Sequence, residues 1–253
     1  MTGHSNSNHP NHNNTSNRHQ PTTRYQDLSS IVPTITTSRL VLSLVTDKDT
    51  HDLQLAAGRP EIADTMISIP HPYPLGEAGR YIQRHQEEAQ QGTSIAFVIR
   101  RQEEEGYAHM NDPKKKNNHT FIGMIEVRAV DIEHWLAELS FWVVVEAWGK
   151  GYMSEAVAAV VNFVFASPQF PYPLNRLYAF HMVRNPACGR LLQRNGFVQE
   201  GILRDRVWKH DRFEDVAICA ILRRDWERQS KGAPNMSTPD VPPNDDGNDD
   251  LVC

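Results

Sequence analysis

Cysteine is scarce in this sequence, and long apolar runs are missing from it. The 253 residues include only three cysteines, Cys188, Cys219 and Cys253, which are too few and too scattered for a disulfide framework or a zinc site. No apolar run approaches the roughly 20 residues that a membrane helix needs, and the N-terminus has no hydrophobic region of a signal peptide. We therefore expect a cytoplasmic protein, with the nucleus not excluded, and no membrane partner.

An excess of positive charge is missing as well. The formal net charge is −5 at pH 7, and residues 231–253 hold five aspartates against one lysine. Three lysines at 114–116 follow three glutamates at 103–105, a pattern typical of a solvated insertion rather than a basic patch. Because nucleic-acid surfaces gather Lys and Arg, the composition predicts no nucleic-acid partner.

Both ends of the chain are poor in apolar residues. The first thirty residues contain six Asn and four His, and the last twenty-three contain five Asp and four Pro. Such segments bury too little apolar surface to offset the entropy of ordering, so we expect disordered tails at 1–30 and 231–253 around one globular domain at 31–230. The His spacing is irregular, and we expect no metal site there.

Between the tails, the apolar periodicity predicts a mixed sheet flanked by helices. Three prolines make residues 67–74 a shaped loop, and residues 102–118 are expected to form a charged hairpin loop. Trp208 and Trp226 are interpreted as packing residues. Strands are expected at 39–45, 94–100, 120–130, 134–144, 176–183, 197–208 and 213–222, and helices near 47–57, 77–90, 156–165 and 187–194.

The most informative stretch is WGKGYMSEA at 148–156, which places two glycines between a strand-like run and an amphipathic helix. The first backbone N–H groups of a helix lack intrahelical partners, so a glycine-rich entry lets a phosphate sit on several of them. Gly149 and Gly151 also suit a plain tight connection, and the loop alone leaves both interpretations open. Ser154 stands where G-x-G-x-x-G requires its last glycine, and no G-x-x-x-x-G-K-[ST] occurs, so neither a dinucleotide fold nor a nucleotide triphosphatase is indicated.

Four blocks in a fixed order resemble the GNAT N-acetyltransferases, in particular the branch that resembles ribosomal-protein-alanine N-acetyltransferases. Each block alone is weak, but together they span about residues 36–227. They are TSRLVL at 37–42 (T-x-R-L-x-L), AELSFW at 137–142 (A-E-[IL]-[GS]-[YF]-W), the stretch at 148–156 (W-G-K-G-Y-x-[ST]-E-A), and NPAC at 185–188 followed by GFVQEG at 196–201 (N-P-A-[SC], then G-F-x-x-E-G).

This resemblance implies an α/β (α+β) GNAT fold with a mixed, mostly antiparallel sheet, and acetyl-CoA as cosubstrate without a metal. The pyrophosphate loop would comprise Trp148, Gly149, Lys150, Gly151, Tyr152 and Met153. The pantetheine arm would contact the backbone of Val143 or Val144 and the side chain of Asn185, which also suits a helix N-cap before Pro186.

Three departures from the family pattern bear on catalysis and binding. Met153 replaces the usual small residue of the loop, so it either crowds the phosphates or turns away. Leu192 stands where many members carry a tyrosine that acts as general acid. Cys188 stands where the branch usually has Ser. Cofactor binding is therefore better supported than any catalytic assignment.

Acetyl transfer to an amine requires an unprotonated amine, a polarised carbonyl and an accommodated thiolate. Glu138 is the first candidate base, because strand alternation puts it on one face with Ser140 and Trp142; pairing with a neighbouring strand is an equal alternative. Glu126 and His181 are rivals. Cys188 could donate to the leaving sulfur, although core packing suits a small cysteine better.

The acceptor is expected to be a primary amine, with a protein N-terminus as the first candidate. The alternatives are a small amine such as a polyamine, antibiotic or toxin, or a non-catalytic acyl-CoA-binding module, which Leu192 and Met153 motivate. Residues 67–74 and 202–215 are expected to shape the acceptor site, but neither names the substrate.

Overall fold

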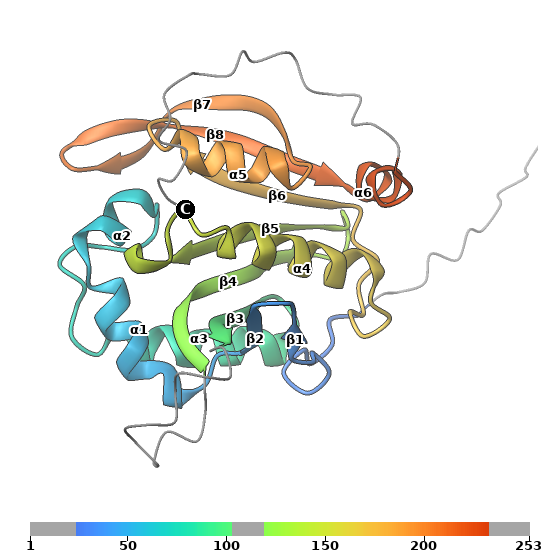
Figure 1. Ribbon diagram of the computed structural model, residues 1–253, viewed down its shortest axis with the longest axis horizontal. Helices are drawn as coiled ribbons and strands as arrows, with labels where there is room; N and C mark the ends of the chain where they lie inside the picture. Colours follow the sequence, from blue (N-terminus) through green and yellow to red (C-terminus); the bar gives the residue numbers. More distant parts are fainter. Residues whose placement is uncertain (1–23, 103–118, 233–253) are drawn as a thin grey trace, which may run out of the picture.

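The computed structural model describes residues 24–102 and 119–232, which form a twisted eight-stranded sheet between two layers of helices (Figure 1). The strand order is β1-β2-β3-β4-β5-β6-β8-β7. All neighbouring pairs are antiparallel except β5 and β6. The strands are β1 (Ile35–Thr36), β2 (Leu40–Leu44), β3 (Ile95–Gln102), β4 (His119–Asp131), β5 (Leu136–Val143), β6 (Arg176–Met182), β7 (Val198–Lys209) and β8 (Arg212–Leu222).

The helices divide between the two faces because successive residues of a strand point to opposite sides. On β5, Leu139 and Phe141 belong to the buried cluster under α4 (Tyr152–Ala166), whereas Trp142 packs into the cluster of α1 (Thr50–Ala57) and α3 (Glu77–Gln91). The remaining helices are α2 (Pro60–Thr65), α5 (Pro186–Arg194), α6 (Arg223–Ser230) and the short turns η1 (Asp47–Asp49) and η2 (Val145–Ala147). The predicted mixed, mostly antiparallel sheet flanked by helices is confirmed.

The parallel pair β5 and β6 positions the site. Its register covers Leu136↔Arg176 to Glu138↔Tyr178, whereas β6 continues along β8 as far as Met182. Past Glu138, therefore, β5 runs on without β6 at its side, and the two strands part in Figure 1. Where two strands separate in this way, backbone N–H and C=O groups lose their partner strand and can form hydrogen bonds with a ligand.

The structure differs from the sequence analysis in several segments. Residues 24–30, assigned to the tail, lie against the domain because Leu28 is fully buried and Tyr25 donates to Val130 O. Helices α2 and α6 and strand β1 were not expected. Trp208 is 60% exposed and meets Phe213 edge to face on the surface of the β7–β8 hairpin, so its predicted packing role is wrong. The rest of both tails and the loop at 103–118 lie outside the described residues.

Candidate active site

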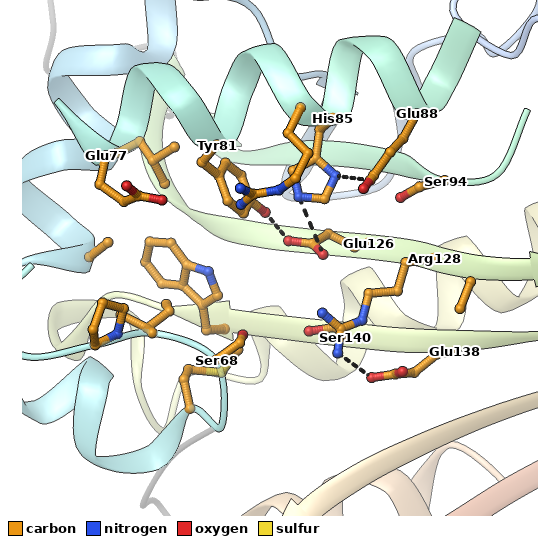
Figure 2. A pocket seen from close by; sticks show the side chains of 18 of the residues that line it. Ser68, Glu77, Tyr81, His85, Glu88, Ser94, Glu126, Arg128, Glu138 and Ser140 are labelled. Carbon is orange, nitrogen blue, oxygen red and sulfur yellow. Dashed lines mark hydrogen bonds and ion pairs between the residues drawn. The ribbon is translucent and has the colours of Figure 1, made fainter. Parts of the chain in front are cut away.

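A cavity of about 440 Å³ lies between α3 and the sheet (Figure 2). Strands β4 and β5 form its floor, α1 and α3 two of its walls, and residues 66–73 a third. Its lining combines aromatic and aliphatic side chains with carboxylates and two arginines. The lining residues used below are Met66, Ser68, Ile69, Tyr73, Glu77, Tyr81, Arg84, His85, Glu88, Ser94, Glu126, Arg128, Glu138, Ser140 and Trp142.

The floor of the cavity is a polar quartet on two neighbouring strands. In the β4–β5 register Glu126 stands opposite Ser140 and Arg128 opposite Glu138. Arg128 Nη2 donates to Glu138 Oε1 at 2.5 Å, and the Glu138 side chain is 14% exposed. Burial opposes the charge of Arg128, but the hydrogen bond and charge of Glu138 raise the pKa of Arg128 above its ordinary value. The predicted placement of Glu138, Ser140 and Trp142 on one face is confirmed, and the Glu138 carboxylate is ion-paired.

Glu126 is the most perturbed acid of the cavity. It is 6% exposed, and burial raises its pKa to about 7, with Arg128 opposing that shift. The Tyr81 hydroxyl donates to Glu126 Oε1, and His85 Nε2 lies 3.8 Å from Glu126 Oε2. A carboxylate that titrates near neutral pH is matched to general acid–base work.

His85 lies between Glu126 and the surface. Helix α3 turns Ala78, Ile82, His85 and Ala89 toward the sheet, and burial lowers the pKa of His85 to about 4. His85 Nδ1 lies 3.1 Å from Glu88 Oε2, and the Glu88 side chain is 34% exposed. The two atoms are close enough for an ion pair, but their geometry does not meet the criteria of a hydrogen bond. Figure 2 shows Glu126, His85 and Glu88 in a row.

A narrow slot opens beside the cavity where β5 leaves β6. Its lining includes Phe141 on β5, His181 on β6, and Asn185 and Cys188 around the start of α5. The slot and the cavity share five lining residues, which mark their junction: Met66, Ser68, Arg128, Glu138 and Ser140.

The glycine-rich loop stands at the start of α4, as expected. Gly149 and Gly151 have φ of 68° and 73°, a left-handed conformation that other residues adopt only with strain. Arg39 Nη1 donates to Lys150 O at 2.9 Å, and Arg39 Nε donates to Glu155 Oε2 at 2.6 Å. Arg39, which directly precedes β2, therefore contacts both the loop and α4.

The other loop residues divide between the core and the surface. Met153 is 3% exposed within the core under α4, so its side chain turns away from the loop. Trp148 Nε1 donates to Val143 O at 2.9 Å, which turns the indole back onto the end of β5. Tyr152 lies under the Arg39 guanidinium, 4.7 Å from its ring centre, and Lys150 is exposed.

Three candidate residues, His181, Asn185 and Cys188, line the slot, and Val144 directly follows β5. Asn185 is 8% exposed and caps α5, accepting a hydrogen bond from Cys188 N at 3.3 Å. Cys188 itself is buried at 6% exposure. Val144 N donates to Ile122 O at 2.8 Å, so that N–H is engaged within the sheet. Burial lowers the pKa of His181 below its ordinary value, although His181 Nδ1 bonds to Met182 O.

The wall at residues 66–73 is held from the far end of the sheet. Lys209 Nζ, at the end of β7, donates to Met66 O at 2.5 Å and to Ile69 O at 3.1 Å. Arg184 Nη1 donates to Asp64 Oδ2 on α2 at 2.9 Å, and Arg184 Nε donates to Glu214 Oε1 on β8 at 3.0 Å. The hairpin of β7 and β8 therefore braces one side of the cavity, and the predicted role of residues 202–215 in shaping the acceptor site stays a prediction.

A family model described as "Acetyltransferase (GNAT) domain" matches residues 39–198. The chain belongs to the GNAT acetyltransferase family. The resemblance seen in the four sequence blocks is confirmed, and with it an N-acetyltransferase of the GNAT fold.

Several known proteins similar to this GNAT acetyltransferase match about three quarters of its length. It is 26% identical over 191 residues to an uncharacterized N-acetyltransferase, YoaA, of Bacillus subtilis, covering 76% of this chain and 97% of the relative. It is 27% identical over 197 residues to the [ribosomal protein uS5]-alanine N-acetyltransferase of Escherichia coli, covering 76% and 92%. The crystal structure of spermidine N-acetyltransferase from Vibrio cholerae with CoA and spermine superposes with a TM-score of 0.61 at 19% identity, covering 76% and 99%.

Sequence reasoning missed Tyr81, His85 and Glu88 of this GNAT domain. One signal was present: His85 falls on the same helical stripe as Ala78, Ile82 and Ala89, which marks a buried polar residue on an apolar face. In the parts of the chain that the structure describes, no three His, Cys, Asp or Glu gather to hold a metal ion. The same ranges contain no helix that is long and apolar enough to cross a membrane.

Proposed function

We propose that this GNAT enzyme transfers the acetyl group of acetyl-CoA to a primary amine held in the cavity, with the thioester in the slot. The observation that carries the proposal is the junction, where Arg128, Glu138 and Ser140 line both spaces. An amine in the cavity and a thioester in the slot can meet only there. The backbone N–H groups of α4 behind Gly149 and Gly151 would bind the pyrophosphate, as in other anion sites at helix N-termini.

The carbonyl of the thioester needs a hydrogen-bond donor at the slot. Val144 N–H is bonded to Ile122 O on the β4 side. Because N–H groups of consecutive strand residues point to opposite sides, the N–H of Val143 points toward the side that β6 has left. We assign carbonyl polarisation to Val143 and a pantetheine contact to the Asn185 amide. Cys188 is disulfide-bonded and has no thiol hydrogen to donate, so we assign it no role at the leaving sulfur.

Glu126 is our candidate for the base that takes the ammonium proton. Its carboxylate is buried and titrates near pH 7, whereas Glu138, the first candidate from sequence, is held by Arg128. A base with a pKa near the working pH combines a large unprotonated fraction with useful proton affinity. In this assignment Glu138 and Arg128 shape the junction, and Tyr81 orients Glu126 by donating to Oε1.

The first candidate acceptor is a protein N-terminus, the kind of amine that the name of the Escherichia coli relative specifies. The cavity offers such an amine both Glu126 and the buried Ser94 hydroxyl, for which the described residues supply no hydrogen-bond partner. A small polyamine is the second candidate. Glu77 and Glu88 add two further carboxylates to the cavity lining, which favours a molecule with more than one ammonium group.

The test is release of the CoA thiol from acetyl-CoA in the presence of either a panel of N-terminal peptides or a panel of small amines, including polyamines. Mass spectrometry of the product identifies the acetylated nitrogen. Turnover with one panel and not the other decides between the two acceptors. Binding of acetyl-CoA without thiol release from any amine would support the remaining alternative, a non-catalytic acyl-CoA-binding module. The cytoplasmic location stays a prediction.

A further inference from the structure

A buried base needs a way to lose the proton that it collects. Each acetyl transfer delivers one proton from the ammonium group, and Glu126 is only 6% exposed at the floor of the cavity. If the proton stayed on the carboxyl group, the next amine would meet an acid instead of a base. The immediate neighbours of Glu126 limit the route. Arg128 offers only donors, and Tyr81 already donates its hydroxyl hydrogen to Glu126 Oε1.

His85 is the neighbour that can accept a proton. Its Nε2 lies 3.8 Å from Glu126 Oε2, the oxygen that Tyr81 leaves open, and its Nδ1 lies 3.1 Å from Glu88 Oε2. Glu88 reaches water, because about a third of its side chain is exposed. These three groups form a row from β4 to the side of α3 that faces the cavity (Figure 2). Catalytic hydrogen bonds are often long before substrate binds and shorten in the complex.

We propose that His85 and Glu88 form a proton relay that carries the proton from Glu126 to solvent after each acetyl transfer. The relay rests on the proposed function, since it assumes that Glu126 is the base. Neither His85 nor Glu88 is assigned a contact with the acetyl group. Both act through Glu126, and both are therefore relay residues rather than catalytic ones.

The relay moves one proton without creating a buried cation. The O–H bond of protonated Glu126 breaks as an N–H bond forms at His85 Nε2, while the N–H bond at Nδ1 breaks and Glu88 takes that hydrogen. Glu88 then gives the proton to water. The imidazole stays neutral throughout, in keeping with the burial that lowers its pKa to about 4. Exchange of the ring hydrogen with solvent after product leaves restores the starting tautomer.

The groups around His85 favour a neutral imidazole that carries its hydrogen on Nδ1. Arg84 on α3 and Arg128 on β4 both disfavour a positive charge on the ring. The Tyr81 ring packs against the imidazole at a tilt of 58°, with ring centres 4.2 Å apart, which restrains the imidazole plane. Glu88 and Glu126 face its two nitrogens, and a neutral ring with hydrogen on Nδ1 matches both: it donates toward Glu88 and presents a lone pair toward Glu126.

The kinetic test compares His85→Gln, His85→Ala and Glu88→Gln with wild type in full-length protein, using the amine found to be acetylated. The matched control is Glu87→Gln, because Glu87 is an exposed carboxylate on α3 that bonds only to Gln83 in the described structure. The His85 variants should lower kcat by about 10², the lower end of the range for positioned proton transfer, with the acetyl-CoA affinity unchanged. Glu88→Gln should lose less, since water can take its place.

Added imidazole should restore part of the kcat of His85→Ala and leave Glu126→Gln unchanged, a pattern that loss of packing would not produce. The ¹⁵N shifts of the ring, assigned with His85→Gln, should show a neutral imidazole with its hydrogen on Nδ1 at pH 7. Wild-type kcat and pH profile in folded His85→Gln, or an imidazolium at pH 7, would overturn the relay. If wild type releases no CoA thiol with any amine, the proposed function fails instead.

Discussion

Arg39, directly before β2, pairs with Glu155, in the first turn of α4, and this pair ties the glycine-rich loop to the edge of β2. Glu155 Oε1 accepts from Thr37 Oγ1 at 2.6 Å and from Arg39 N at 3.0 Å, while Glu155 Oε2 accepts from Arg39 Nε at 2.6 Å. Burial raises the pKa of Glu155, but these hydrogen bonds outweigh it and hold that pKa below its ordinary value. Two sequence blocks more than a hundred residues apart thus form one support for the cofactor loop.

Glu155→Ala should weaken acetyl-CoA binding about tenfold, which corresponds to about 1.4 kcal/mol, because Arg39 would lose the carboxylate that holds its guanidinium beside Lys150 O. The kcat at saturating acetyl-CoA should stay close to wild type, since Glu155 does not line the junction. Calorimetric titration measures the first quantity and thiol release the second. Glu146→Ala is the control, because Glu146 is an exposed carboxylate paired with Arg59. Equal affinities in the two variants would contradict the role of Glu155.

Gly151→Asp and Gly151→Asn separate charge from backbone strain. Both side chains tolerate the left-handed conformation better than most, and both suit a helix N-cap. A Cβ at this position meets only Arg39 Nη2, at 3.5 Å. The Asp variant should bind acetyl-CoA at least tenfold more weakly than the Asn variant, because its carboxylate repels the pyrophosphate. Calorimetry on the two variants, matched by their melting temperatures, measures the difference. Indistinguishable affinities would place the phosphates elsewhere.

Glu126→Gln and Glu138→Gln decide which carboxylate is the base. Removing a positioned base typically lowers turnover by about 10² to 10⁴. We expect that loss for Glu126→Gln, with acetyl-CoA affinity nearly unchanged and a defect that shrinks at higher pH as free amine accumulates. Glu138→Gln should instead raise the KM for the amine, because it releases Arg128 at the junction. The reverse pattern in steady-state kinetics would return the base role to Glu138.

Stability should depend on pH through two opposing groups. The folded pKa of Glu126 is raised from 4.5 to about 7. Between these values the native state keeps a proton that the unfolded state has lost, so stability falls as pH rises. The folded pKa of His85 is lowered from 6.5 to about 4, so the unfolded state binds the extra proton there and stability rises with pH. Each slope is about 1.4 kcal/mol per pH unit, and the two nearly cancel from pH 4.5 to 6.5.

Single substitutions should expose each slope. Relative to wild type, the free energy of unfolding of Glu126→Gln should increase with pH between 4.5 and 7, and that of His85→Gln should decrease between 4 and 6.5. Urea unfolding at half-unit pH steps measures both, and the difference from wild type removes the titrations that all three proteins share. Curves parallel to wild type in both variants would show that neither group is perturbed.

Much of the fold followed from the sequence, because the strands and the α4 entry carry strong local patterns. The site followed only in part. The Arg128–Glu138 pair depends on the β4–β5 register, and a register shift between Arg128 and Asp131 means that counting back from the turn would mispair these strands. The short helix α2 had one local signal, Pro60 at its first turn. The row from Glu126 to Glu88 brings β4 and α3 together across the core, and no local pattern encodes that approach.

Lys209 joins the carbonyls of Met66 and Ile69 across about 140 residues of sequence. The acceptor wall is therefore composite: residues 66–73 supply its surface and the β7–β8 hairpin supplies its anchor. Grafting the wall loop alone between members of this family would transfer side chains without the anchor that sets their position. Grafts that move both segments together are the ones that should carry acceptor preference with them.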